Sequence, residues 1–137
     1  MKLLIGKNSS IVKNIREKLI DFEFVSHKDI KKLNFKKYEY IYVFSWSRKS
    51  LDDNLKVLKN LPIEKVVFIS TLAIYSINIR KQWNSYPKHK LLAEKYVAEN
   101  NGKILRIGIT EDHIRQFSAY DIPVTAYDDI ADFLNSD

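Results

Sequence analysis

Short apolar runs alternate with segments of helical periodicity along almost the whole chain. KLLI at Lys2–Ile5 and KVVFIS at Lys65–Ser70 are apolar on successive residues, which is typical of parallel strands buried on both faces. SIVKNIREKLI instead places apolar residues at i, i+3 and i+4, the pattern of an amphipathic helix. The predicted strands are Lys2–Ile5, Phe22–Val25, Tyr38–Phe44, Lys65–Ser70, Lys103–Gly108 and Pro123–Ala126. The predicted helices are Ser10–Ile20, Leu51–Leu61, Pro87–Asn100 and Asp128–Leu134.

This alternation of strands and helices predicts an α/β fold built from parallel βαβ units. No repeat, linker or low-complexity segment interrupts it, so we predict a single domain over residues 1–137. The expected architecture is a Rossmann-like, doubly wound parallel sheet with helices on both faces and the strand order 3-2-1-4-5-6. A ligand would then bind at the carboxyl ends of the strands, where that order reverses.

Composition narrows the chemistry. The chain has no cysteine, which excludes disulfides and thiolate metal sites. His27, His89 and His113 lie far apart in the sequence without ligand-like spacing, so we predict no metal site. The apolar run at the start of the chain is far too short for a signal peptide or a membrane span. We therefore expect a cytoplasmic protein that does not associate with a membrane.

The formal net charge of +6 is unevenly distributed. Residues 110–137 hold one arginine and seven acidic side chains, so the basic charge belongs to the rest of the chain. A basic body could attract nucleic acid, a membrane surface or a phosphorylated small molecule, or its lysines could simply solvate exposed faces. No nucleic-acid-binding motif accompanies Trp46 and Trp83, which makes a nucleic-acid partner the least favoured of these.

A glycine stands directly after the first strand and directly before the first helix. At this position the pyrophosphate of a dinucleotide would meet the helix N-terminus. Gly6 is followed three and six residues later by Ser9 and Val12, where a complete dinucleotide fingerprint has glycines. Ser9 and Ser10 could offer hydroxyls to a phosphate, or they could only cap the helix.

The end of the second strand bears on which dinucleotide would bind. A carboxylate placed there hydrogen-bonds the ribose 2′-hydroxyl of NAD. Here Ser26, His27 and Lys28 come before Asp29, and a 2′-phosphate would be better tolerated among them. His27 and Lys28 therefore favour NADP over NAD.

Three segments resemble, in order, the extended short-chain dehydrogenase/reductase family of sugar-nucleotide epimerases, dehydratases and reductases. They are KVVFISTLAIYS, YPKHKLLAEKYV and GKILRIG, and the resemblance extends over nearly the whole chain. Members of that family continue a strand into a Ser-Ser/Thr-x-x-x-Tyr-Gly turn, begin a helix with Tyr-x-x-x-Lys and end the next strand with Leu-Arg. Asn54 and the YDDIADFL segment also stand where similar residues occur in the family.

The resemblance implies a role for each matching residue. Tyr86 would be the general acid/base, and Lys90 would lower the pKa of that tyrosine and hold the nicotinamide ribose. Thr71 would hydrogen-bond the substrate oxygen. NAD or NADP would be the cofactor, and a nucleotide or nucleotide-sugar the ligand. A homodimer through the helices at Leu51–Leu61 and Pro87–Asn100 is also implied.

The chain departs from that family in its length, since typical members carry a C-terminal substrate domain. Only about twenty residues separate Gly108 from the YDDIADFL segment. Two functions of different classes therefore remain open. One is a minimal NAD(P)-dependent enzyme of nucleotide-sugar or polysaccharide metabolism whose site is completed by a partner subunit. The other is a non-catalytic Rossmann-like module that binds a nucleotide or another protein.

Overall fold

The structure is a computed structural model that describes residues 1–47, 49–72, 86–110 and 124–136. Five parallel strands form one sheet in the order β2-β1-β3-β4-β5. The strands of this sheet are β1 (Lys2–Ile5), β2 (Phe22–Val25), β3 (Ile41–Val43), β4 (Val66–Thr71) and β5 (Lys103–Ile107). Two short strands, β6 (Ile109–Thr110) and β7 (Val124–Thr125), form a separate parallel pair.

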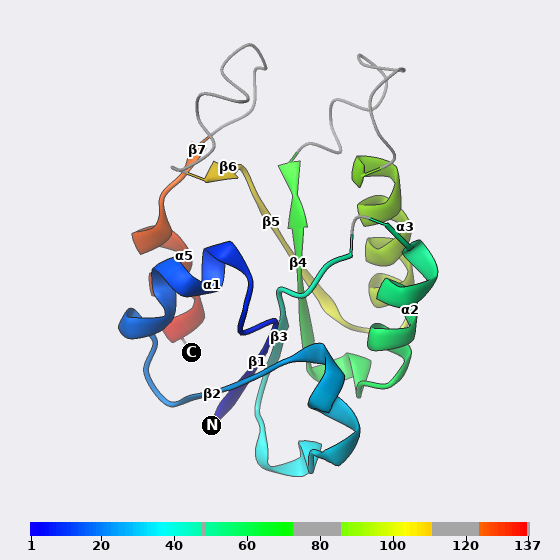
Figure 1. Cartoon of the computed structure of the whole chain (residues 1–137), viewed down its shortest axis with the longest axis horizontal. Coiled ribbons are helices and arrows are strands. Elements are labelled where there is room, and N and C mark those ends of the chain that lie inside the picture. Colours follow the sequence, from blue (N-terminus) through cyan, green and yellow to red (C-terminus); the bar gives the residue numbers. More distant parts are fainter. Residues whose placement is uncertain (48, 73–85, 111–123, 137) are drawn as a thin grey trace.

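Helices cover both faces of the sheet, as Figure 1 shows. On one face lie α1 and α5, and on the other lie α2 and α3. The helices are α1 (Ser10–Ile15), α2 (Leu51–Lys59), α3 (Tyr86–Glu99) and α5 (Tyr127–Asn135). Short 3-10 segments lie at Arg16–Lys18, His27–Lys32, Phe35–Lys37 and Ile63–Lys65. The predicted α/β, Rossmann-like fold class is confirmed.

Alternate residues of each strand supply the two hydrophobic cores. In β4, Val66 and Phe68 are buried under α2 and α3, while Val67 and Ile69 are buried on the face that carries α1 and α5. This alternation is what a parallel strand covered on both sides requires. It also places Ser70 on the same face as Val66 and Phe68, toward α3.

The predicted strand order 3-2-1-4-5-6 is wrong. The strand at Ile41–Val43 does not lie outside β2 but pairs directly with β1, with Leu3 opposite Ile41. All three of its residues are buried, and such a strand needs neighbours on both sides. β2, with Glu23 between two half-buried phenylalanines, suits the edge of the sheet. The observed order is that of the flavodoxin-like doubly wound sheets.

The segment between β2 and β3 explains why the described part of the chain has no strand beyond β2. It forms two 3-10 segments whose first turns are closed by side chains. The hydroxyl of Ser26 accepts a hydrogen bond from the amide of Lys28, and the side chain of Asn34 accepts one from the amide of Lys36. These local bonds compete with extended backbone pairing.

Gly102 follows α3, but it does not adopt the left-handed conformation that ends the helix. That conformation belongs to Asn101, with φ of 68°. A Cβ atom on Gly102 would lie 2.5 Å from Val97 Cγ1 and 2.9 Å from the backbone oxygen of Ile63. The glycine therefore allows the chain to pass closely between α3 and the turn before β4.

Candidate functional site

The candidate site lies at the carboxyl ends of β1, β3 and β4. The order of the strands reverses between β1 and β3, so this edge is the topological switch point at which open α/β sheets bind ligands. Gly6 follows β1, Trp46 lies beyond β3, and Thr71 ends β4. Lys90 reaches the same edge from α3.

Gly6 is held tightly against the end of β3. Its φ is +104°, and a Cβ atom on it would lie 2.6 Å from the backbone nitrogen of Ser45. Its amide donates to the carbonyl of Val25 at 2.9 Å, which ties the turn to β2 as well. A glycine is thus required here for both conformation and space.

The start of α1 is closed by its own residues. The hydroxyl of Ser9 accepts a hydrogen bond from the amide of Val12 at 3.3 Å, which makes Ser9 the N-cap. Val12 is fully buried in the core between α1 and the sheet. Ser10 is exposed, and its carbonyl accepts from the side chain of Asn14. These residues therefore build a capped helix start.

Lys90 is a buried cation. Its side chain is 6% exposed, and its Nζ donates to the carbonyl oxygen of Ile69 at 2.9 Å. The same Nζ lies 4.2 Å from the ring centre of Trp46 and 4.9 Å from that of Phe68. A carbonyl dipole and two aromatic faces thus offset part of the cost of removing the amine from water.

The other two residues of the expected catalytic set are placed only in part. Thr71 is half-buried at the end of β4, two residues after the carbonyl that binds Lys90. Tyr86 is the first residue of α3, one turn before Lys90 and therefore on the same helix face. The side chain of Tyr86 lies outside the described residues. The catalytic roles of the three remain predictions.

Ser45 carries an unusual hydroxyl at the switch point. Its Oγ is buried and has no hydrogen-bond partner among the residues that the structure describes. A buried hydroxyl without a partner costs free energy that most native sites avoid. The backbone of Ser45 lies close to Gly6, and Ser45 directly precedes Trp46 in the sequence.

Asn54 fixes the loop that follows β3. The side-chain oxygen of this buried residue of α2 accepts from the amide of Ser47 at 2.7 Å. Its side-chain nitrogen donates to the carbonyls of Ser47 at 2.8 Å and Ser50 at 3.0 Å. Asn54, which the resemblance singled out, therefore holds the loop next to Trp46 in place.

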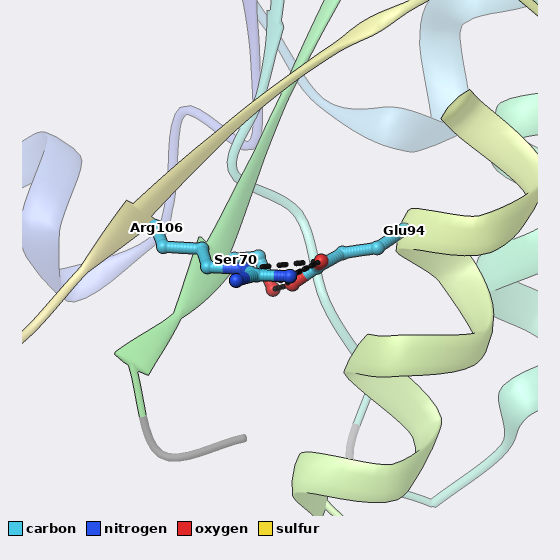
Figure 2. Close-up of polar contacts among 3 residues, drawn as sticks. All are labelled: Ser70, Glu94 and Arg106. Atoms are coloured by element: carbon cyan, nitrogen blue, oxygen red, sulfur yellow. Dashed lines mark hydrogen bonds and ion pairs between the residues drawn. The ribbon is translucent and has the colours of Figure 1, made fainter. Parts of the chain in front are cut away.

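A polar network joins α3 to β4 and β5, as Figure 2 shows. The hydroxyl of Ser70 donates to Glu94 Oε2 at 2.6 Å. Arg106 donates from Nε to both carboxylate oxygens at 3.1 Å, and from a terminal nitrogen to Oε1 at 2.6 Å. Glu94 is only 3% exposed, so its charge is neutralised inside the protein.

Sequence reasoning did not single out this network. Ser70 and Arg106 stand opposite each other in the parallel register of β4 and β5, so they share a face of the sheet. Glu94 lies one turn after Lys90 on the inward side of α3. One signal in the sequence could have revealed it. Glu94 falls within the buried stripe of its helix, and the two neighbouring covered strands each have a polar residue near the end, Ser70 and Arg106.

His27 and Lys28 follow β2, which neighbours β1 in the sheet. Both are exposed on the 3-10 segment His27–Lys32. They lie where the resemblance puts the recognition of the adenosine ribose, and neither forms part of the buried cluster around Lys90. Their preference for NADP stays a prediction.

In the ranges that the structure describes, no group of histidine, aspartate and glutamate side chains could hold a metal ion. Among those same residues, no helix combines the length and the apolar character needed to cross a membrane.

NAD or NADP, which the resemblance implies, fits one end of this site better than the other. At the ribose end, the amine of Lys90 lies at the end of β4, where it donates to the carbonyl of Ile69. At the pyrophosphate end, Ser9 occupies the helix cap and Val12 fills the space that a glycine would leave. The described start of α1 therefore lacks the close backbone cradle that holds a pyrophosphate tightly.

Comparison with known proteins supports the fold. The chain is similar to the crystal structure of the capsular polysaccharide assembling protein CapF from Staphylococcus aureus, with a TM-score of 0.58 and 16% sequence identity. The match covers 96% of this chain and 47% of that one, so this chain spans about half the length of CapF. No family model and no curated protein matches the chain. At this identity the likeness is one of fold.

Proposed function

We propose that this chain is a degenerate Rossmann-like protein of the short-chain dehydrogenase/reductase type that acts in nucleotide-sugar or polysaccharide metabolism. The observation that carries the proposal is the buried Lys90, whose amine binds the Ile69 carbonyl at the end of β4. This edge of a doubly wound sheet is where the acid/base pair of that family would act, and Lys90 places an amine there. Tyr86 begins the same helix one turn earlier.

The metabolic assignment draws on CapF. That protein is named for assembling capsular polysaccharide, and this chain shares its fold over 96% of its own length. A nucleotide-sugar is the form of ligand that the sequence resemblance also implies. The two lines of reasoning agree on a role in building a carbohydrate polymer.

The cofactor would be NAD or NADP, bound weakly. The capped start of α1 and the buried Val12 deny the pyrophosphate a close approach to backbone amides. We expect a dissociation constant in the high-micromolar range or weaker. A partner subunit would complete the substrate site.

A non-catalytic module is the second candidate, and a specific observation favours it. Lys90 already has a carbonyl partner and lies against the Trp46 ring at 4.2 Å, so its amine is engaged within the protein itself. Under this reading, Tyr86 and Lys90 are scaffold residues, and the edge formed by β1, β3 and β4 binds a nucleotide or a protein without turnover.

Ligand binding tests the proposal first. Thermal unfolding would be followed with NAD, NADP and uridine-diphosphate sugars, each at millimolar concentration. A ligand at about ten times its dissociation constant, which millimolar concentrations reach for a high-micromolar binder, stabilises the protein by about 1.4 kcal/mol, which the method detects. If calorimetry shows no heat with either dinucleotide, the enzyme proposal fails and the module remains.

Two substitutions then separate chemistry from binding. If a ligand is turned over, Tyr86→Phe should abolish turnover and leave binding unchanged, because it removes only the transferable proton. Lys90→Met should reduce both, since it removes the charge while keeping much of the side-chain volume. Lys95→Met on the exposed side of α3 is the matched control, and it should change neither.

A further inference from the structure

Two hydrogen bonds tie α3 to β4 side by side. Lys90 donates to the carbonyl of Ile69 at 2.9 Å, and one turn later Glu94 accepts from the hydroxyl of Ser70 at 2.6 Å. The strand residues are consecutive, and Thr71 comes next. Whatever sets the position of Ser70 relative to α3 therefore also sets the Ile69 carbonyl and Thr71 relative to Lys90.

Glu94 has the properties of a rigid anchor for these bonds. Its carboxylate accepts from Arg106 of β5 through two nitrogens, a bidentate arrangement with fixed geometry. Glu94 is 3% exposed, so water has little access to its carboxylate, while the side chain of Arg106 is 33% exposed. Figure 2 shows the three side chains converging from α3, β4 and β5 on one point.

The Lys90–Ile69 bond does not by itself fix the distance between α3 and the end of β4, because a lysine side chain has four rotatable bonds and can follow a shift of the helix. The Trp46 ring that the amine faces lies after β3, on a different strand from Ile69. The link from Glu94, one turn later on α3, to Ser70, the next residue of β4, fixes the distance that the flexible lysine leaves open.

We propose that Glu94 is a positioning residue for the candidate site. Through Ser70 and Arg106 it holds the end of β4 against α3, so that the amine of Lys90 stays on the Ile69 carbonyl and over Trp46. The inference rests on the proposed function of Lys90. It assigns no ligand contact to Glu94 itself.

The test uses the indole N–H resonance of Trp46 in the full chain, without ligand. This resonance is assigned by its loss in Trp46→Phe, and Lys90→Met gives its position when no ammonium lies over the ring. Glu94→Gln should move the Trp46 resonance most of the way to the Lys90→Met position. Glu99→Gln is the matched control on α3, because Glu99 forms only an exposed pair with Lys95 at 3.9 Å.

Ser70→Ala keeps the measurement decisive if Glu94→Gln does not fold. It removes only the link to β4 and leaves the Glu94–Arg106 pair in place. A Trp46 resonance that stays at its wild-type position in a folded Glu94→Gln or Ser70→Ala variant, while Lys90→Met moves it, would overturn the proposal. This readout needs neither cofactor nor turnover, so its failure is distinguishable from failure of the proposed function.

Discussion

At Lys90 a charged amine lies among apolar side chains, and at Glu94, one turn away, a carboxylate does the same. Isolated buried charges are costly, and each is tolerated here because fixed partners face it. Lys90 has a carbonyl and two aromatic rings, and Glu94 has a guanidinium and a hydroxyl. Apolar side chains at these two positions would be enough to pack α3 against the sheet. The helix instead carries two buried charges of opposite sign on one face, each with its own partners.

The sequence predicted one of these two charges. Lys90 was found because a tyrosine stands four residues before it, a spacing that a known family uses. Glu94 was missed because an acidic residue in a helix is usually on the exposed face, and only tertiary packing turns this one inward. The environment of Trp46 was equally unpredictable, because its ring meets Lys90 across two elements that are distant in the sequence.

A second residue-scale cluster makes stability depend on pH. The phenol of Tyr38 donates to the carboxylate of Glu23, and this bond, with a smaller contribution from Lys37, lowers the pKa of Glu23 below its ordinary 4.5. Burial, followed by the bond to Glu23, raises the pKa of Tyr38 above 10.0. The free energy contributed by Glu23 is lost as pH falls below about 4.5. That contributed by Tyr38 is lost as pH rises above about 10.

We predict that Tyr38→Phe flattens both ends of this pH profile. It should lower the free energy of unfolding near neutral pH by about 1 kcal/mol, the usual net value of one hydrogen bond. Urea unfolding from pH 3 to 11 measures both effects. Tyr96→Phe, at a half-buried tyrosine of α3, is the control and should keep the wild-type profile. An unchanged acid limb in Tyr38→Phe would contradict the role of the Tyr38–Glu23 bond.

At the scale of the elements, periodicity predicted the kind and the approximate bounds of the α-helices and of every described strand except β6 (Ile109–Thr110). Strands Lys2–Ile5 and Phe22–Val25 have the predicted bounds, whereas the predicted Ser10–Ile20 helix ends as an α-helix at Ile15 and continues as a 3-10 turn. The order of the strands was not predictable in the same way. The strand order depends on the burial of both faces of Ile41–Val43, which the sequence indicates. It also depends on β2 being the edge strand among the described residues, which the sequence does not indicate.

Two substitutions at the end of α3 distinguish the effect of steric crowding from the effect of the backbone conformation. Gly102→Ala should lower the free energy of unfolding by about 1–3 kcal/mol, because the new methyl group would meet Val97 Cγ1 and the Ile63 backbone. Asn101→Gly should change the free energy of unfolding by less than about 1 kcal/mol. It introduces no steric clash, and it only removes the strain of a non-glycine residue at φ of 68°. Chemical denaturation of both variants checks this. Equal stability of Gly102→Ala and wild type would show that the backbone moves apart at little cost.

For the whole molecule, the remaining question is what completes the site. The chain matches about half the length of CapF. Its described residues supply one edge of a sheet, the buried amine of Lys90 beside Trp46, and the Glu94–Arg106 pair. The helices α2 and α3 cover the same face of the sheet, next to the loop that Asn54 holds. A second copy packed on this pair would lie beside the carboxyl ends of β3 and β4.

The surface of α3 supports association through these helices. Leu91 is 43% exposed and Leu92 is 49% exposed, on the side of α3 away from the buried stripe of Lys90, Ala93, Glu94 and Val97. We predict that the chain is a homodimer at tens of micromolar. Leu92→Asp should make it monomeric without unfolding it, because burying a charge at the centre of the interface costs free energy. Sedimentation velocity measures the change. Ile20→Asp is the matched control, because Ile20 is 72% exposed on the opposite side of the sheet, where its amide binds Asn135 of α5. A monomeric wild-type chain, or dissociation by Ile20→Asp in place of Leu92→Asp, would rule out an interface built on α3.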